Sequence, residues 1–249
     1  MTTFALSTQH LVKKFGGFVA TDDVTLNVAA GSRHALIGPN GAGKTTLINL
    51  LTGFLEPTSG RVILGEEDVT SLPQHARVKR GLARTFQINR LFADMTVLES
   101  VMLAVCERRG LGARFFNPVA SHADAVDESA ELLVRLRLAD VANERTRNLA
   151  YGKQRLIEIA LALAERPRVL LLDEPAAGVP TRESRELFET ISQLPRDVTI
   201  VLIEHDMDLV FRFADRISVL VSGALLTEDV PEAIAKDRRV KQLYLGEAG

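Results

Sequence analysis

The chain has 249 residues, 46% of them apolar and 25% charged, with a formal net charge of −2. This composition is that of an ordinary globular protein and excludes a disordered chain, a collagen and a coiled coil. The near-neutral charge gives no support for non-specific nucleic-acid binding. The single cysteine excludes an intramolecular disulfide and fits a reducing compartment.

Membrane-directing features are missing from the sequence. Met1–His10 lacks the basic start and long apolar stretch of a secretory signal. No run approaches the roughly 18 apolar residues that span a bilayer. We therefore expect any role at a membrane to depend on a partner.

The first half of the chain contains strand-like segments and then a helical region. Phe4–Leu64 contains several candidate strands, which we expect to be antiparallel. His34–Ile37 leads into a glycine-rich loop and then into Thr45–Phe54, where apolar residues recur at helical spacing. From about Met95 to Leu138 the pattern is mostly helical, with a turn-rich loop at Gly110–Ser121.

Apolar strands return in the second half and alternate with helical patterns. Val169–Leu172 precedes a helical pattern at 182–194, Val198–Ile203 precedes Asp206–Phe213, and Ile217–Val221 follows. Continuous apolar strands alternating with helices indicate a parallel sheet covered on both faces. We predict an α/β fold with a mostly parallel sheet, an N-terminal antiparallel β part and an inserted helical subdomain.

The glycine-rich loop reads G-P-N-G-A-G-K-T and matches the pattern G-x-x-x-x-G-K-[ST]. Glycines let successive backbone amides face phosphate oxygens, and the following helix directs its positive end to the same phosphates. Lys44 suits the β- and γ-phosphates, and the Thr45 hydroxyl suits Mg²⁺. A chance glycine turn is the alternative, but the strand and helix around the loop favour a P-loop NTPase core. The nucleotide-binding candidates here are Gly38, Pro39, Asn40, Gly41, Ala42, Gly43, Lys44, Thr45 and Thr46.

Two carboxylates end the most apolar strand, at Asp173 and Glu174. Ligands of open α/β sheets bind at this edge, so Asp173 suits a Mg²⁺ role through water, and Glu174 could polarise the attacking water as a general base. A solvated strand end is the alternative interpretation. His205 follows the next strand and is expected close to the γ-phosphate.

These elements, in this order over essentially the whole chain, resemble the nucleotide-binding subunits of ABC transporters. The resemblance implies that Phe15 stacks on adenine, that Gln87 senses Mg²⁺ and the attacking water, and that His205 is the switch histidine. It implies a signature element, which completes the ATP site of a second subunit, at Leu149, Ala150, Tyr151, Gly152, Lys153 and Gln154. The catalytic candidates are then Glu174, His205, Gln87 and Lys44, and the Mg²⁺ candidates are Thr45, Gln87 and Asp173.

The same resemblance predicts the domain organisation. It implies one ABC ATPase domain over residues 1–249, with a nucleotide-binding α/β core at 1–87 and 149–249 and a helical subdomain at 88–148.

The signature element departs from the usual L-S-G-G-Q of the family at Ala150, Tyr151 and Lys153. Losing the serine hydroxyl removes a hydrogen bond to a charged phosphate, about 1.5–3 kcal/mol. We hypothesise that the positive charge of Lys153 offsets part of this loss. Pro180 stands where the family's following loop has an aspartate, and proline has neither a carboxylate nor an N–H. This favours an asymmetric pair with a different ATPase.

One subfamily is more similar than the rest. Gly81–Gln87, Arg90–Phe92, Met95–Glu99 and Leu243–Glu247 resemble ATPases of branched-chain (hydrophobic) amino-acid importers. The resemblance implies an ATP-hydrolysing subunit that uses ATP and Mg²⁺ and powers such an importer from the cytoplasmic face of the cell membrane. The implied partners are a second ABC ATPase subunit, two integral-membrane permease subunits and, indirectly, a substrate-binding protein, but no nucleic acid.

The sequence leaves two alternative functions open and argues against several others. A related solute such as urea stays open as the substrate, and so does a weakly hydrolysing regulatory ABC subunit. The chain has no long coiled-coil insertion of a DNA-repair ABC ATPase, no second cassette of a translation factor and no N-K-x-D segment of a GTPase. A small-molecule kinase shares the phosphate loop but does not predict the signature element or the glutamine loop.

Overall fold

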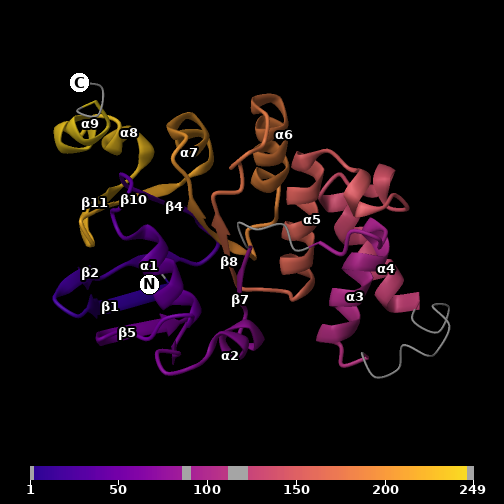
Figure 1. Ribbon diagram of the computed structural model, residues 1–249, viewed down its shortest axis with the longest axis horizontal. Helices are drawn as coiled ribbons and strands as arrows, with labels where there is room; N and C mark the ends of the chain where they lie inside the picture. Colours follow the sequence, from indigo (N-terminus) through magenta and orange to yellow (C-terminus); the bar gives the residue numbers. More distant parts are fainter. Residues whose placement is uncertain (1–2, 86–90, 112–122, 246–249) are drawn as a thin grey trace. The chain divides into compact units, whose positions relative to one another are not determined.

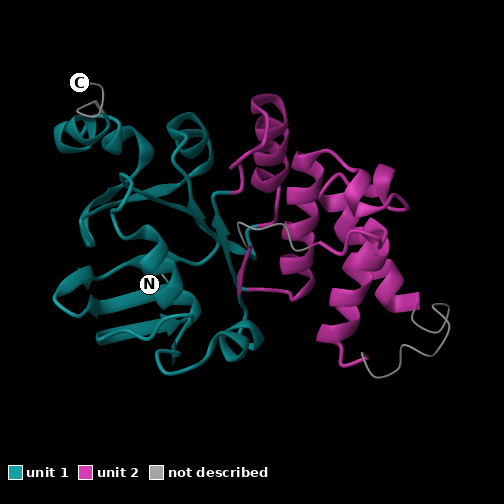
Figure 2. Ribbon diagram, in the orientation of Figure 1, with its two compact units in different colours: residues 1–82, 168–174, 196–249 teal, residues 83–167, 175–195 magenta. Residues whose placement is uncertain are grey.

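The computed structural model describes residues 3–85, 91–111 and 123–245. Contacts divide the chain into two compact units, coloured separately in Figure 2. Unit 1 comprises Met1–Leu82, Arg168–Glu174 and Arg196–Gly249, and unit 2 comprises Ala83–Pro167 and Pro175–Pro195. The division expected from the sequence, with a helical subdomain at 88–148, stays a prediction.

Unit 1 contains an antiparallel sheet near the N-terminus, in indigo and purple in Figure 1. Its strand order is β2-β1-β5-β6, and β3 also pairs with β1. The strands are β1 (Phe4–Phe15), β2 (Phe18–Val24), β3 (Asn27–Ala29), β5 (Ser59–Leu64) and β6 (Glu67–Asp68). The predicted N-terminal antiparallel part is therefore confirmed.

The second sheet has the order β11-β10-β4-β9-β8-β7. The neighbours β10, β4, β9 and β8 run parallel, and β11 pairs antiparallel with β10 at the edge. The strands are β4 (Arg33–Ile37), β7 (Leu82–Arg84), β8 (Val169–Asp173), β9 (Thr199–Ile203), β10 (Arg216–Val221) and β11 (Ala224–Asp229). Every residue of β4, β8 and β9 is buried, which explains why apolar side chains predominate in these strands.

Helices cover both faces of this sheet within unit 1. Along β4, Leu36 joins a core cluster with Leu47 and Leu50 of α1 and with residues of the antiparallel sheet, so α1 lies between the two sheets. The neighbouring Ala35 and Ile37 join the cluster on the opposite face, because successive side chains of a strand alternate. That face is covered by α7, α8 and α9. The helices of unit 1 are α1 (Lys44–Thr52), α2 (Gln74–Lys79), α7 (Met207–Phe213), α8 (Pro231–Ile234) and α9 (Arg238–Leu245).

Parallel pairing aligns the carboxyl ends of three strands. Ile203 at the end of β9 pairs with Leu36 of β4 on one side and with Asp173 of β8 on the other. The segments that follow these strands therefore leave the sheet at one edge. They are the phosphate loop, Glu174 and the Glu204-His205 pair.

Unit 2 is helical. Its helices are α3 (Val97–Arg108), α4 (Ala123–Arg135), α5 (Tyr151–Ala164) and α6 (Thr181–Ser192), with short 3₁₀ turns at Ala139–Val141 and Thr146–Asn148. Helix α3 contacts α4 and α5, and α5 contacts α6. The capping box predicted at Thr96 is present, since its side chain accepts from the Glu99 N–H and the Glu99 carboxylate accepts from the Thr96 N–H. None of the helices in the described ranges combines the length and hydropathy that crossing a bilayer requires.

Candidate functional site

The phosphate loop connects β4 to α1 and is held close to neighbouring strands. Gly43 is the N-cap of α1 with φ +96°, and a Cβ on it would lie 2.6 Å from the carbonyl oxygen of Ala20. A Cβ on Gly38 would lie 2.2 Å from the carbonyl oxygen of Leu220. Both positions therefore require glycine, because the loop backbone packs directly on backbone atoms.

Lys44 folds back over this loop. Its Nζ donates hydrogen bonds to the carbonyl oxygens of Gly38, at 2.6 Å, and Pro39, at 3.0 Å. Burial lowers the pKa of the Lys44 ammonium below its ordinary value, and the charges of Glu174 and Asp173 act in the opposite direction. The loop thus holds a half-buried cation beside the N-terminus of α1, where an anion is doubly favoured.

A cavity of about 600 Å³ opens over the phosphate loop. All of its lining residues belong to unit 1. They are Phe18, Val19, Ala20, Asn40, Gly41, Ala42, Gly43, Lys44, Thr45, Thr46, Glu174, Ser222 and Gly223. The structure therefore brings Glu174 to the phosphate loop, 130 residues away in sequence, as the sheet topology predicts.

Glu174 has a constrained backbone. Its φ is +47°, which is uncommon for a residue with a side chain, and its N–H donates to the carbonyl oxygen of Ile203 at 2.9 Å. Strained backbone of this kind concentrates at functional sites. Ser222, another residue that lines the cavity, has the same φ of +47°.

Oxygen atoms that suit Mg²⁺ lie near Lys44. Thr45 is an exposed residue lining the cavity, and Asp173 is a buried residue at the end of β8 whose charge acts on Lys44. Within the described ranges, no three His, Cys, Asp or Glu side chains are grouped to hold a metal by themselves. A hydroxyl and one carboxylate fit an ion that keeps several waters and binds substrate phosphates, as Mg²⁺ does.

His205 lies at the same edge of the sheet. Its side chain is 68% exposed, and Nδ1 is 3.7 Å from Oε2 of the buried Glu204. The His205 N–H donates to the same carboxylate oxygen at 3.1 Å. Among the described residues that line the cavity, neither His205 nor Asp173 is present.

Two exposed aromatic residues lie at the tip of the β1–β2 hairpin. Phe15, the predicted adenine partner, is 48% exposed, and the Lys13 ammonium lies 5.2 Å from its ring centre. Among the described lining residues of the cavity, Phe18 is present and Phe15 is not. Phe18 is not among the residues predicted from the sequence, although two aromatic residues flanking Gly16-Gly17 are a recognisable hairpin signal.

The remaining candidates lie elsewhere. Gln87 is outside the described residues. The predicted signature element is in unit 2, where α5 begins at Tyr151 with Ala150 as its N-cap and Leu149 buried before it. Gly152 is buried, and Lys153 pairs with Asp140 at 2.5 Å. A second cavity, of about 620 Å³, lies beside this helix start and is lined by Ala150, Gly152 and Lys153 together with residues of α6.

Comparisons with known proteins agree with this geometry. A family model described as ABC transporter matches residues 21–177. The high-affinity branched-chain amino acid transport ATP-binding proteins LivG of Escherichia coli (strain K12) and BraF of Pseudomonas aeruginosa are each 42% identical, over 98% of both chains. The solved ADP conformation of an ATP-binding cassette of an ABC transporter superposes with a TM-score of 0.85 at 31% identity, covering 99% of each chain. The chain therefore belongs to the ABC transporter family, as one of its ATP-binding proteins.

Proposed function

We propose that this ABC ATPase powers the uptake of branched-chain amino acids or chemically similar apolar solutes. The observation that carries the catalytic part is the single cavity in which the phosphate loop, Lys44, Thr45 and Glu174 meet. The substrate class rests on the likeness, along the whole chain, to two ATP-binding proteins named for branched-chain amino acid transport.

The side chains divide the chemistry of ATP hydrolysis between them. Lys44 and the amides of the loop bind the phosphates, and the exposed rings at the hairpin tip bind the base. Thr45 and Asp173 are the oxygen donors for Mg²⁺, which when bound neutralises phosphate charge. Glu174 accepts a proton from the attacking water, and His205, with Gln87, orients the γ-phosphate and that water.

Converting ATP hydrolysis into transport requires further subunits. We propose that the signature element at Leu149–Gln154 completes the nucleotide site of a second ATPase subunit, so that ATP draws the two subunits together and hydrolysis releases them. Pro180, which replaces a carboxylate residue of the family pattern, favours a second subunit that differs from this one. Two permease subunits in the membrane, served by a substrate-binding protein, would convert this motion into transport from the cytoplasmic face.

Replacing Glu174 by glutamine tests the catalytic part. In the purified transporter complex we expect Glu174→Gln to lower ATP turnover at least ~10²-fold, since a general base contributes about that much, while ATP binding persists. Glu66→Gln, at an exposed turn between β5 and β6, is the matched control and should leave turnover unchanged. A wild-type complex as inert as Glu174→Gln would instead favour a regulatory subunit.

Uptake measurements test the substrate class. With the transporter reconstituted in vesicles and supplied with its binding protein, we expect leucine, isoleucine or valine to stimulate ATP turnover and to be taken up. Urea in the same assay should do neither. Stimulation by urea alone would assign the chain to a transporter of a different small solute.

A further inference from the structure

The start of α5 is capped by another helix. Its N-cap residue is Ala150, which carries no hydrogen-bond acceptor in its side chain. The first N–H groups of a helix have no partner within it and are usually satisfied by a Ser, Thr, Asp or Asn at the N-cap. Here the N–H of Gly152 donates to Oε2 of Glu183 on α6, at 2.8 Å.

Gly152 is shaped for this contact. A Cβ added to it would lie 2.8 Å from Oε2 and 3.0 Å from Cβ of Glu183. Any larger residue at position 152 would therefore displace Glu183 or move α6. Glycine destabilises a helix relative to alanine. Here the absence of a side chain allows the Glu183 carboxylate to approach the backbone of α5 closely.

The negative charge of Glu183 is favoured by the N-termini of two helices. It lies in the first turn of α6 and reaches the first turn of α5, so its carboxylate is near the positive ends of two helices. The anion that the start of α5 favours is therefore a carboxylate of the same chain, that of Glu183.

A cavity lies beside this hydrogen bond, since Gly152 and Glu183 both line it. It measures about 620 Å³, and Arg137, Lys153 and Arg182 contribute cations to its wall. Glu183, Glu186 and Glu189 contribute carboxylates, and the residues all belong to unit 2. An anion entering this cavity would find the Gly152 N–H already bound to Glu183.

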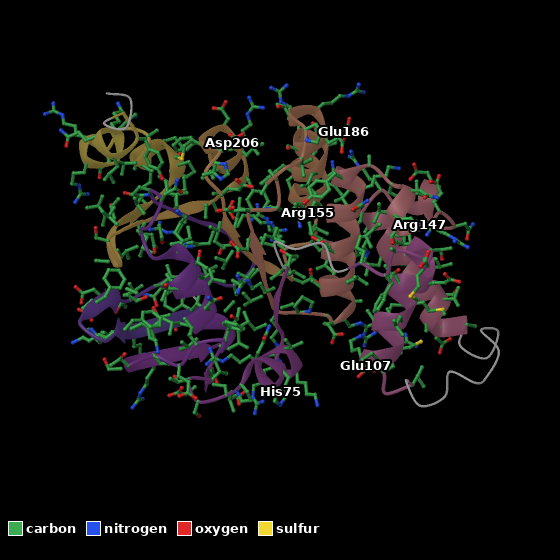
Figure 3. All side chains as sticks on the ribbon, viewed as in Figure 1. His75, Glu107, Arg147, Arg155, Glu186 and Asp206 are labelled. Atoms are coloured by element: carbon green, nitrogen blue, oxygen red, sulfur yellow. The ribbon has the colours of Figure 1, made fainter. Side chains whose placement is uncertain are left out.

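A second contact joins the start of α5 to the loop that precedes α6. A Cβ on Gly178, whose φ is +76°, would lie 3.4 Å from Cε1 of Tyr151. The Tyr151 hydroxyl accepts a hydrogen bond from Nη2 of Arg155, at 2.8 Å, and Arg155 is a buried residue of α5 labelled in Figure 3. The tyrosine ring is held by its own helix and packs on the loop that follows Glu174.

We propose that Glu183 is a positioning residue, an anion that α6 supplies to the start of the signature helix α5 and that a nucleotide phosphate of the second ATPase subunit must displace from the Gly152 N–H. This inference rests on the proposed function. Displacement frees the first turn of α6, whose chain leads directly back through Gly178 to Glu174. Binding at the signature element is thereby connected to the catalytic segment of the same subunit, at the cost of a higher ATP requirement.

Glu183→Gln tests this proposal, because it keeps the shape and loses the charge. In the intact transporter we expect the ATP concentration for half-maximal turnover to fall about 10-fold, which corresponds to ~1.4 kcal/mol, with kcat within about twofold of wild type. The matched control is Glu131→Gln, at an exposed position of α4 in the same unit that is absent from the described lining of this cavity. It should change neither quantity.

A merely structural cap predicts the opposite pattern. In that case Glu183→Gln lowers the melting temperature and kcat, and the half-maximal ATP concentration stays constant or rises; this result would overturn the proposal. A wild-type complex without ATP turnover contradicts the proposed function itself and is therefore a separate result.

Nuclear magnetic resonance of the full chain gives a readout that needs no partner. With ¹⁵N-glycine labelling and inorganic phosphate as the probe, we expect the Gly152 amide to respond at about tenfold lower phosphate concentration in Glu183→Gln than in wild type. Gly41 and Gly43 of the phosphate loop serve as internal controls and should respond equally in both. An equal response of Gly152 in both proteins would contradict displacement, whereas silent loop glycines would contradict the phosphate-loop assignment.

Discussion

Phe15 and Phe18 face each other across the Gly16-Gly17 turn as directly paired residues of β1 and β2. Opposite residues of an antiparallel pair point to the same side of the hairpin. Both residues are exposed, at 48% and 66%. Two exposed aromatic rings on one face, one of them lining the cavity over the phosphate loop, are an arrangement that a flat ligand such as adenine would cover.

We expect Phe15→Ala and Phe18→Ala each to weaken ATP binding. Stacking of a base on an aromatic ring is worth about 1–3 kcal/mol by alanine substitution, so the dissociation constant should rise roughly 5- to 150-fold. Isothermal titration of the full chain with ATP measures this. Phe54→Ala removes another highly exposed ring that is absent from the described cavity lining and should have no effect. If Phe18→Ala binds ATP with wild-type affinity, Phe18 does not contact the base and only Phe15 remains as its stacking partner.

Removing the Lys44 charge should separate binding from stability. In Lys44→Met the phosphates lose a charge-assisted hydrogen bond worth about 1.5–3 kcal/mol, so we expect the dissociation constant for ATP to rise at least ~10-fold. Because burial lowers the pKa of this ammonium, losing its charge should leave the melting temperature within about 2 °C of wild type. Titration calorimetry and thermal melting measure the two effects, with Lys79→Met on the exposed end of α2 as control. Unchanged affinity would count heavily against the phosphate-loop assignment.

The sequence predicted those parts of the fold that carry a local pattern. Apolar side chains predominate in β4, β8 and β9 because both faces of these strands are buried. The capping box at Thr96 needs only residues three positions apart. The edge strand β11 was missed, because Ala224–Asp229 is mostly half-buried and its pairing with β10 decides its conformation.

Contacts between residues that are distant in the sequence decide how much of the site could be predicted. Parallel strands place Glu174 at the phosphate loop, and this could be reasoned out because the rule for their shared edge is general. The hydrogen bond from Gly152 to Glu183 spans 31 residues and follows from no local pattern, since it depends on how α5 and α6 pack. The local sequence predicts Gly152 as part of the signature element but carries no signal for its partner Glu183.

The pairing of Lys153 with Asp140 makes its proposed role in ATP binding testable in both directions. Their charged atoms are 2.5 Å apart, and the Lys153 charge lowers the pKa of the Asp140 carboxyl through a side-chain hydrogen bond. If the Lys153 charge supports nucleotide binding by a second subunit, Lys153→Gln should raise the half-maximal ATP concentration of the transporter about 2- to 5-fold, the size of a surface charge effect. Asp140→Asn, which removes its counter-charge, should lower this concentration. If both variants show the half-maximal ATP concentration of the wild type, Lys153 only forms the ion pair with Asp140 and does not contribute to nucleotide binding.

Buried His34 gives the protein a dependence of stability on acid pH. Its Nε2 lies 2.7 Å from Oγ of Ser218, which donates its proton to Glu228 at 2.9 Å, so Nε2–H of a neutral His34 is the donor to Ser218. Burial lowers the pKa of His34 to about 4; Glu228 acts against this shift and Arg216 adds to it. The unfolded chain, with a histidine pKa near 6.5, binds a proton at a higher pH than the folded protein does.

The free energy of unfolding should therefore fall as the pH drops from about 6.5 to about 4, because between these values the unfolded state binds the extra proton. For His34 this amounts to about 3 kcal/mol, at 1.36 kcal/mol per pKa unit. Urea denaturation at pH 7, 6, 5 and 4 measures it, and the stability gap between wild type and His34→Gln should shrink by that amount towards pH 4. His75→Gln, which removes an exposed histidine at the start of α2, should leave the slope of wild type unchanged. A gap between wild type and His34→Gln that stays constant from pH 7 to pH 4 would show that His34 takes up its proton equally in both states.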